Sequence, residues 1–366
     1  MSGEETRLER LQAELRETQL DVLLVEAATD VRYLTGFTGS NGMALVDVRE
    51  PASPQLFLTD FRYDTQSAAQ VPPAFERRIV TGELLDAAAA TLEGASGRLG
   101  FDDTSLTVAR HLRLGELLGT SWELVPGSGL VERLRLVKEA GEINLIRGAA
   151  ELADEALRQV LEQGLVGRTE RDIAIELELR MRRLGAEGPS FPSIVAAGPH
   201  AALPHAAPLA KEIPPDVLVT IDWGALHEGY CSDCTRTYAT GEDISQEARV
   251  VYGLVLEAQL KALSALRAGP TGREIDAIAR AVIEAGGHGE HFGHGLGHGV
   301  GLDIHEPPRL ARTAGKDPLP AGTVVTVEPG IYLPGELGVR IEDLVVVRDG
   351  GAEVLTRLSK ELTVVS

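Results

Sequence analysis

Two pairs of acidic residues stand where a β-hairpin would bring the members of each pair together. The first pair lies in "VTIDWGALHEGYCSDCT", where a turn between His227 and Glu228 places Asp222 opposite Asp233. Directly opposed residues on a hairpin have Cβ atoms about 5 Å apart, and like charges at that distance destabilise the pairing. The sequence therefore predicts that something neutralises these two carboxylates.

The second pair lies in "VEPGIYLPGELGVRIED", where a hairpin centred on Gly335 places Glu328 opposite Glu342. A solvated strand face is the more common setting for an acidic pair. Here the flanking residues indicate buried strands, namely Val219, Ile221, Trp223, Val325, Val327, Ile341, Leu344 and Val345. Buried carboxylates have to be paired, protonated or bound to a metal, and Arg340 alone cannot balance four of them.

A glycine-rich run, "GGHGEHFGHGLGHGVGLDIHEPP", supplies histidines that could complete a metal site. It contains His288, His291, His294, His298 and His305. Glycine lets a backbone approach a site closely and take up tight turns. We interpret His288 and His291 as residues of a surface loop, whereas the patterned flanks of His294, His298 and His305 indicate a functional site.

Five of these residues carry a family resemblance. In chain order, Asp222, Asp233 in "GYCSDCTRT", His298 in "HGLGHGVGLDIHE", Glu328 in "VEPG" and Glu342 in "GVRIED" resemble the metal ligands of the pita-bread metallopeptidases. That group includes proline dipeptidase, aminopeptidase P and methionine aminopeptidase. The segment "VRYLTGFTGSNG" resembles the N-terminal domain of prolidases, aminopeptidases P and creatinases. The resemblance extends over nearly the whole chain, and the leading domain favours the proline-directed branch.

The resemblance implies a site with two divalent metal ions, and four carboxylates with one imidazole suit manganese, cobalt or zinc. It implies that Asp233 and Glu342 bridge the two ions, that Asp222 completes one, and that His298 with Glu328 completes the other. Such ions lower the pKa of a shared water, which then attacks the scissile carbonyl. The resemblance also gives Glu328 a catalytic role in moving a proton.

Further residues resemble the substrate-binding and catalytic side chains of the family. His305, His205 in "GPHAALPHAAP" and His294 are expected to hold substrate, and His305 and His205 to stabilise the tetrahedral intermediate. Arg340 is expected to orient Glu342 and its neighbour Asp343. The alternatives are an exposed loop position for His205 and a plain salt bridge for Arg340.

The two cysteines of the chain, Cys231 and Cys234, have the spacing of redox sites and zinc half-sites. Three residues of a strand span about 10 Å, which exceeds the roughly 7 Å between Cα atoms that a disulfide allows. A zinc half-site would need a second pair of ligands. We therefore predict that Cys234 is a core residue and that Cys231 shares a face with Asp233.

Composition narrows the class of protein. The 366 residues are 43% hydrophobic and carry a formal net charge of −20, which argues against nucleic-acid or membrane partners. The first 20 residues, "MSGEETRLERLQAELRETQL", predict a charged amphipathic helix rather than a signal peptide. We expect a cytoplasmic protein, and the resemblance implies a homodimer.

The order of helical and strand patterns predicts the architecture. The patterns indicate an α/β domain over residues 1–130, followed by a domain of long helices and hairpins over residues 131–366. The resemblance implies that the first is a creatinase-type N-terminal domain and the second an α+β pita-bread catalytic domain of the creatinase/aminopeptidase class. Within the second domain, "GRTERDIAIE" and "GPTGREIDAIA" resemble each other and place Thr169 beside Thr271. Two helix–helix–hairpin halves, and so a pseudo-two-fold internal repeat, are expected.

Together these observations predict a dinuclear-metal-dependent peptidase that hydrolyses Xaa-Pro bonds. An Xaa-Pro dipeptidase (prolidase), which must recognise a free carboxylate after proline, is preferred. The alternative is an Xaa-Pro aminopeptidase (aminopeptidase P), which accepts longer peptides. A non-catalytic pita-bread binding module, or a creatinase-like hydrolase without metal, would require gaps among the five ligand positions, and the sequence fills all five.

Overall fold

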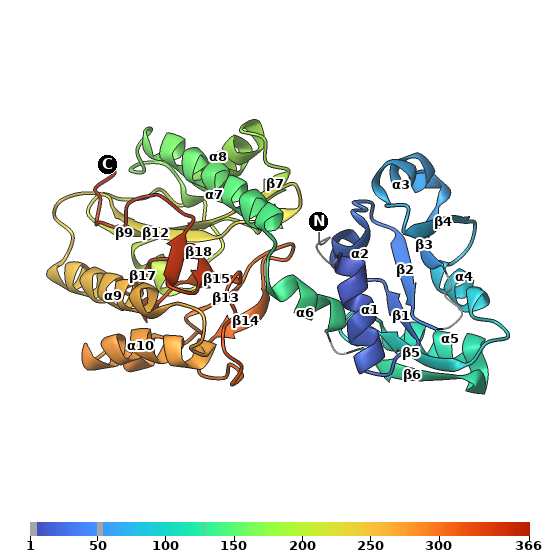
Figure 1. Cartoon of the computed structure of the whole chain (residues 1–366). Helices are drawn as coiled ribbons and strands as arrows, with labels where there is room; N and C mark the ends of the chain where they lie inside the picture. Colours follow the sequence, from blue (N-terminus) through green and yellow to red (C-terminus); the bar gives the residue numbers. More distant parts are fainter. Residues whose placement is uncertain (1–5, 50–53, 128) are drawn as a thin grey trace. The chain divides into compact units, whose positions relative to one another are not determined.

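The protein, described here by a computed structural model, forms two units, Met1–Arg135 and Leu136–Ser366 (Figure 1). The structure describes residues 6–49, 54–127 and 129–366. The first five residues of the predicted N-terminal helix lie outside these ranges. The helix itself, α1 (Arg7–Glu17), is capped by Thr6, which shares a capping box with Glu9. In the described ranges, no helix is long and apolar enough to cross a membrane.

The first unit is built on a six-stranded sheet in the order β4-β3-β2-β1-β5-β6. Strand β2 runs antiparallel to its neighbours, and the remaining pairs are parallel. The strands are β1 (Val22–Val25), β2 (Gly42–Asp47), β3 (Gln55–Asp60), β4 (Phe75–Val80), β5 (Gly97–Phe101) and β6 (Trp122–Pro126). The other helices are α2 (Ala28–Thr35), α3 (Asp64–Gln70), α4 (Leu84–Thr91), α5 (Val108–Leu118) and α6 (Leu130–Leu136). Alternate residues of β1, β2 and β3 pack against α4 and α5 in one core, as expected for an α/β sheet.

The second unit contains four long helices around antiparallel strands. The helices are α7 (Ala140–Leu161), α8 (Glu170–Arg183), α9 (Gln246–Ala265) and α10 (Gly272–Ala285). The strands of the first half are β7 (Gly188–Pro189), β8 (Ile194–Ala197), β9 (Leu218–Trp223), β10 (Ala225–His227), β11 (Tyr230–Cys231) and β12 (Cys234–Ala239). Those of the second half are β13 (Gly297–Gly299), β14 (Glu306–Leu310), β15 (Val324–Val327), β16 (Gly330–Leu333), β17 (Leu337–Arg340), β18 (Asp343–Arg348) and β19 (Gly351–Val354).

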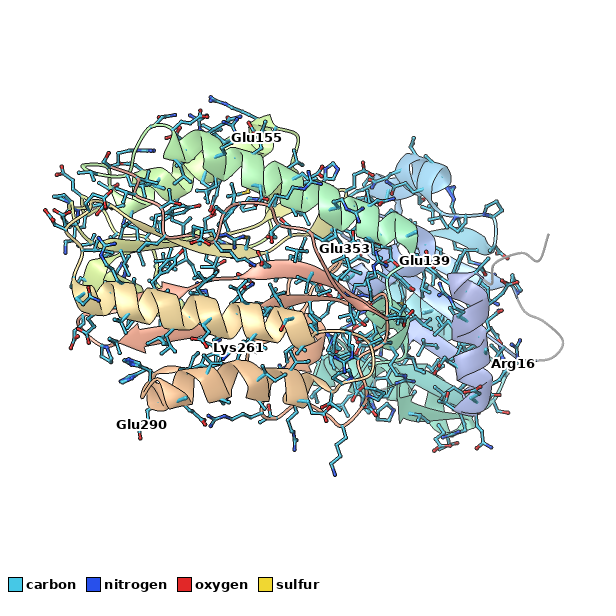
Figure 2. The ribbon with its side chains drawn as sticks, turned by 60° about the vertical axis from the view of Figure 1, so that its left-hand side comes forward. Arg16, Glu139, Glu155, Lys261, Glu290 and Glu353 are labelled. Atoms are coloured by element: carbon cyan, nitrogen blue, oxygen red, sulfur yellow. The ribbon has the colours of Figure 1, made fainter. Side chains whose placement is uncertain are left out.

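The predicted internal repeat is present in this unit. The order α7, α8, β8, β9, β12 recurs as α9, α10, β13, β15, β18, and in each half the three strands pair antiparallel in chain order. Helices α7 and α8 lie on one side of the strands and α9 and α10 on the other, each pair with its own core (Figure 1). Charged side chains such as Glu155 and Glu290 point outward from the strands (Figure 2).

The two threonines matched by sequence occupy the same place in each half. Thr169 caps α8 and Thr271 caps α10, each accepting a hydrogen bond from the backbone three residues on. Each also forms an isolated bridge to a later segment, to Glu212 and to Pro318 respectively. The weak local resemblance between the halves therefore reflects a structural repeat.

The turn of the first acidic hairpin differs from the prediction. It lies at Glu228 and Gly229, whose φ angles of 46° and 80° define the two-residue turn that matches strand twist. Asp222 consequently pairs with Thr235, and the prediction that it stands opposite Asp233 is wrong by two residues. A shift of two residues keeps both carboxylates on one face of the hairpin, because side chains alternate with a period of two.

The predicted continuous strand over "GYCSDCTRTYATG" is interrupted at Ser232 and Asp233, between β11 and β12. Ser232 still donates its backbone N–H to Ala225, so the hairpin stays closed. Cys231 and Cys234 are not joined by a disulfide, as the spacing argument predicted, and Cys234 is buried in the core as expected.

The second acidic hairpin has the predicted register. Val327 pairs with Asp343 in one ladder and Gly330 with Arg340 in the next. Glu328 and Glu342 occupy the matching positions between the two ladders. The prediction that they face each other is confirmed.

A substitution at Gly224 tests how closely the strands of the first hairpin approach each other. A Cβ there would lie 1.9 Å from the Ser232 carbonyl oxygen and 2.2 Å from Ser190 Oγ. We expect Gly224→Ala to lower the free energy of unfolding by about 1–3 kcal/mol, as overpacking does. Gly253→Ala is the control, because a Cβ there meets no described atom within 4 Å and an alanine inside α9 adds about 0.5–1 kcal/mol. Denaturant unfolding measures both, and equal stability of Gly224→Ala and wild type would contradict the close approach.

Candidate metal centre

Three of the predicted ligands form a buried acidic cluster. Asp222, Asp233 and Glu342 each offer a carboxylate oxygen within 4.8 Å of the others. Asp222 comes from β9, Asp233 from the break before β12, and Glu342 from the break before β18. Asp233 and Glu342 are 5% and 1% exposed, so their charges are held away from water.

The other two predicted ligands adjoin this cluster. His298 Nε2 lies 3.5 Å from Asp233 Oδ2 and 3.4 Å from Glu328 Oε1. His298 Nδ1 donates to the Gly299 carbonyl at 3.1 Å, which leaves Nε2 free of its proton and directed at the acids. Gly297 makes this placement possible, because a Cβ there would lie 2.0 Å from the Thr326 carbonyl oxygen.

Crowding and burial shift the pKa values of these groups. Burial, followed by the charge of Glu342, raises the pKa of Asp233 well above its ordinary value. Burial raises the pKa of Glu342 in the same direction and that of Glu328 to about 8. Burial and the neighbouring His305 lower the pKa of His298 to about 4. In the metal-free protein the centre therefore holds extra protons on its acids and a neutral imidazole.

Arg340 contacts Asp222 directly and reaches Glu342 through Thr235. Its Nη2 donates to Asp222 Oδ2 at 2.7 Å and its Nε to Thr235 Oγ1 at 3.0 Å. It makes no direct hydrogen bond to Glu342 or Asp343 among the described residues, so the prediction that it orients them is wrong in that form. The connection to Glu342 is indirect, because Thr235 Oγ1 donates to Glu342 Oε2 at 2.7 Å.

Tyr332 was missed by the sequence analysis and links two predicted residues. Arg340 Nη1 donates to its hydroxyl at 2.8 Å, and the hydroxyl lies 2.9 Å from His294 Nε2. His294 Nδ1 donates to the Gly295 carbonyl, so Nε2 accepts from Tyr332. A signal existed in the register, because Tyr332 and Arg340 are diagonal neighbours on one face of the β16–β17 hairpin.

His305 and His205 lie on the margin of the centre. The ring of His305 is 4.2 Å from that of His298, centroid to centroid. His205 is exposed, and its preceding residue Pro204 accepts a hydrogen bond from Arg340 at 3.2 Å. Burial and the nearby His205 lower the pKa of His305. Both histidines are exposed beside the centre.

The donor set fits divalent metal ions. Asp222 Oδ1 and Glu342 Oε1 are buried atoms without a hydrogen-bond partner among the described residues. A buried carboxylate oxygen without a partner is costly, and a cation would satisfy both. Four carboxylates and one imidazole Nε2 match the oxygen and nitrogen ligands of hard and borderline divalent ions.

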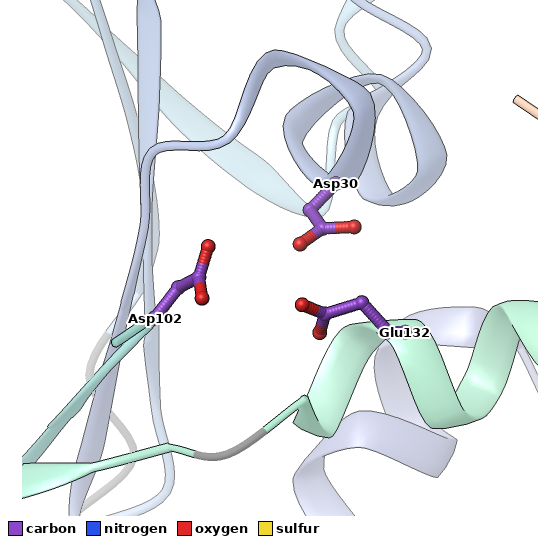
Figure 3. Close-up of side chains that lie close together, drawn as sticks. All are labelled: Asp30, Asp102 and Glu132. Atoms are coloured by element: carbon purple, nitrogen blue, oxygen red, sulfur yellow. The ribbon is translucent and has the colours of Figure 1, made fainter. Parts of the chain in front are cut away.

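A second acidic cluster lies in the first unit and differs in this respect. Asp30, Asp102 and Glu132 turn their carboxylates toward one another, within 4.8 Å (Figure 3). Arg135 Nη1 donates to Asp30 Oδ1 at 2.7 Å, and burial raises the pKa of Asp30 to about 7. The Arg135 guanidinium therefore offsets part of the negative charge of this cluster.

Comparison with known families identifies the class of protein. Residues 144–349 match metallopeptidase family M24, and residues 7–137 match the creatinase/prolidase N-terminal domain. The chain therefore belongs to metallopeptidase family M24, with the pita-bread fold and the creatinase-type N-terminal domain that its motifs resembled.

Individual relatives are similar over almost the whole chain. An Xaa-Pro dipeptidase of Pyrococcus furiosus is 35% identical and covers 97% of this chain and 99% of its own. The solved structure of an Xaa-Pro dipeptidase from Bacillus anthracis is 40% identical, with a TM-score of 0.92 over 98% of this chain and 99% of that one. An X-Pro aminopeptidase structure from Thermotoga maritima is 37% identical, with a TM-score of 0.88 over 98% and 100%.

The raised carboxyl pKa values predict how stability depends on pH. Between pH 6.5, the ordinary histidine value, and pH 8, the folded metal-free protein keeps protons on Glu328 and its neighbours that the unfolded chain has lost. The free energy of unfolding of protein treated with a chelator should therefore fall as pH rises through this range. Glu328→Gln should reduce the slope. Thermal unfolding at several pH values measures it, and a flat profile for the metal-free wild type would contradict the shifts.

The affinity for metal should rise with pH, whereas the stability of the metal-free protein should fall. Binding requires deprotonated carboxylates, so metal affinity should increase from pH 6.5 to 8 and protons should be released on binding. Titration calorimetry in two buffers of different ionisation enthalpy counts those protons. Affinity that does not change with pH would show that the carboxyls are already ionised.

Proposed function

We propose that this protein is an Xaa-Pro dipeptidase that uses two divalent metal ions to hydrolyse the bond preceding proline. The observation that carries the proposal is the buried cluster of Asp222, Asp233 and Glu342, with His298 and Glu328 in contact with it. The names of the Pyrococcus furiosus and Bacillus anthracis relatives support the substrate class.

The ligand roles that we assign are those that the family resemblance implies. We assign Asp233 and Glu342 to bridge the two ions, Asp222 to one ion, and His298 with Glu328 to the other. When bound, the ions supply an activated water and a polarised scissile carbonyl. Manganese, cobalt and zinc all suit the donor set. Arg340 holds the remaining oxygen of Asp222 through its 2.7 Å bond and so fixes the direction of that ligand.

Catalysis and substrate binding are assigned to the margin of the centre. Glu328, whose Oε1 lies 3.4 Å from His298 Nε2, is assigned to take up a proton and return it to the leaving amine. His305 and His205 are assigned to the substrate carbonyl and its developing charge. His294 is assigned to the substrate side as well, with its ring orientation fixed by Tyr332.

The proline requirement follows from amide chemistry. An Xaa-Pro bond is a tertiary amide without an N–H, so a site that cleaves it recognises the ring rather than an amide donor. An Xaa-Pro aminopeptidase is the second candidate, favoured by the similarity to the Thermotoga maritima structure. A non-catalytic binding module is disfavoured because all five ligand positions are filled and adjacent.

The remaining expectations complete the proposal. We propose an N-terminal domain over 1–130 and a catalytic domain over 131–366, a homodimeric assembly and a cytoplasmic location. The net charge of −20 supports a peptide partner rather than a nucleic acid or an anionic membrane.

Substrate length separates the two candidate activities. Manganese-loaded protein should hydrolyse an Xaa-Pro dipeptide with a higher kcat/KM than an Xaa-Pro-Xaa tripeptide, because a dipeptidase depends on the free carboxylate of proline. Both rates are measured by using chromatography to monitor release of the N-terminal residue from each peptide. Cleavage of the tripeptide alone would assign the protein as an aminopeptidase, and no cleavage of either peptide with any common divalent ion would refute both activities.

Asp233→Asn tests the central ligand. The asparagine amide is nearly the same size as the carboxylate but carries no charge. We expect the variant to retain no metal and its kcat/KM to fall by at least about 100-fold, because the same carboxylate serves metal binding and catalysis. Metal content after gel filtration and activity are the two measurements. Asp30→Asn, in the other acidic cluster, is the matched control and should keep both. An active Asp233→Asn protein with its full metal content would remove Asp233 from the centre.

A further inference from the structure

Arg236 is a buried cation that the metal centre does not use as a ligand or a substrate contact. It is 1% exposed and stands three residues after Asp233. Nearly all of its hydrogen bonds reach backbone carbonyls or a carboxylate. The partners are the carbonyls of Glu342, Thr235 (3.0 Å), Leu358 (2.8 and 3.1 Å) and Ser359 (3.2 Å), and Asp343 Oδ1 (2.8 Å). Cys234 Sγ lies 3.3 Å from its Nη1.

Asp343, the neighbour of the ligand Glu342, gathers donors from segments far apart in the sequence. They come from β12, α9 and the segment after β19. The donors are Arg236 and Thr356 (2.8 Å each) to Oδ1, and Gln259 (2.8 Å) and Lys360 to Oδ2. A carboxylate with two donors on each oxygen has one orientation that satisfies all of them. Asp343 therefore connects both halves of the repeat.

The two predicted bridging ligands are joined through this connection. The backbone N–H of Glu342 donates to the Thr235 carbonyl at 3.0 Å, and Thr235 Oγ1 donates to Glu342 Oε2 at 2.7 Å. Arg236 binds the Glu342 carbonyl from the other side. The backbone that carries Asp233 is thereby fixed to the backbone that carries Glu342.

Like charges at this distance oppose such an arrangement. Asp233 and Glu342 repel each other when ionised, and without a restraint the two strands could separate until a metal arrives. A restrained pair needs no reorganisation when the ions bind, which raises affinity. The restraint has to lie outside the ligand set, and Arg236 with Asp343 occupies that position.

We propose that Arg236 and Asp343 are positioning residues that set the separation of Asp233 and Glu342 for metal binding. Lys360 and Thr356 contribute by fixing the carboxylate of Asp343. The inference rests on the metal ligands assigned under the proposed function. It extends the metal centre to a segment, Thr356–Lys360, that supplies neither ligand nor substrate contact.

Metal affinity tests the inference directly. Mn²⁺ binding to chelator-treated protein is measured by titration calorimetry, alongside the unfolding temperature of the metal-free protein. Asp343→Asn presents an amide N–H₂ to donors and should weaken Mn²⁺ binding by about 10–100-fold, the usual effect of losing a partner of a metal ligand. Lys360→Met should weaken it by several-fold, and Lys360→Arg, which keeps a cation, should restore it.

A matched control separates positioning from general stability. Asp30→Asn changes another buried Arg–Asp pair, in which Arg135 and Asp30 are 5% and 3% exposed, and should leave Mn²⁺ affinity unchanged whatever its effect on the unfolding temperature. If Asp343→Asn does not fold, the Mn²⁺ affinities of Lys360→Met and Thr356→Val test the inference instead, because both substitutions leave the Arg236–Asp343 pair in place.

The outcomes are distinct. Weaker Mn²⁺ binding in the Lys360→Met protein, with restoration by Lys360→Arg, supports the inference. Wild-type affinity in all folded variants, even with lowered unfolding temperatures, overturns it and makes the network purely structural. A wild-type protein that binds no Mn²⁺, Co²⁺ or Zn²⁺ overturns the proposed function itself, and the inference with it.

Discussion

Four carboxylates crowded together, two of them buried and two partly buried, are the constraint on which the second unit depends. Asp222, Asp233, Glu328 and Glu342 repel one another, and Arg340 supplies a single positive charge among them. The cost appears in the raised pKa values of three of these acids and in two carboxylate oxygens without a described partner. A protein that maintains such a site needs divalent cations to bind there, and it needs rigid strands to hold the acids together until they do.

The scaffold meets this constraint by placing the predicted ligands on or beside closely paired strands. Two hairpins, one in each half of the repeat, bring the acids in from opposite sides. Gly224 and Gly297 let the strands approach more closely than a side chain allows. Hydrogen bonds from Thr235 and Arg236 to Glu342, and from Arg340 to Asp222, reach from one half to the other. The internal repeat thus has a physical purpose here, because each half alone carries only part of the centre.

Turn chemistry explains which part of the register could be predicted. In the second hairpin, Gly335 marks the turn and the pairing of Glu328 with Glu342 follows by counting. In the first hairpin, Glu228 adopts a positive φ, which is rare for glutamate. The turn predicted from the sequence therefore lies one residue before its position in the structure. The predicted face of each carboxylate is still correct, because a change of two residues in the strand pairing leaves every side chain on the same face. The partner of Arg340 could not be predicted, because Asp222 lies on a strand from the other half.

The sequence by itself indicated an α/β domain, a repeat of helices and hairpins, and two acidic pairs with histidines in a glycine-rich run, because hydrophobic periodicity, glycine positions and residue chemistry are local properties. The pita-bread fold and the set of five adjoining side chains came from the family resemblance of its motifs. The tertiary structure alone decided how those side chains are held. Tyr332 connects His294 to Arg340, and Asp343 draws donors from α9, β12 and the segment after β19. Such contacts join residues up to 107 positions apart, as between Arg236 and Asp343. They depend on how the helices and strands pack, which no local pattern records.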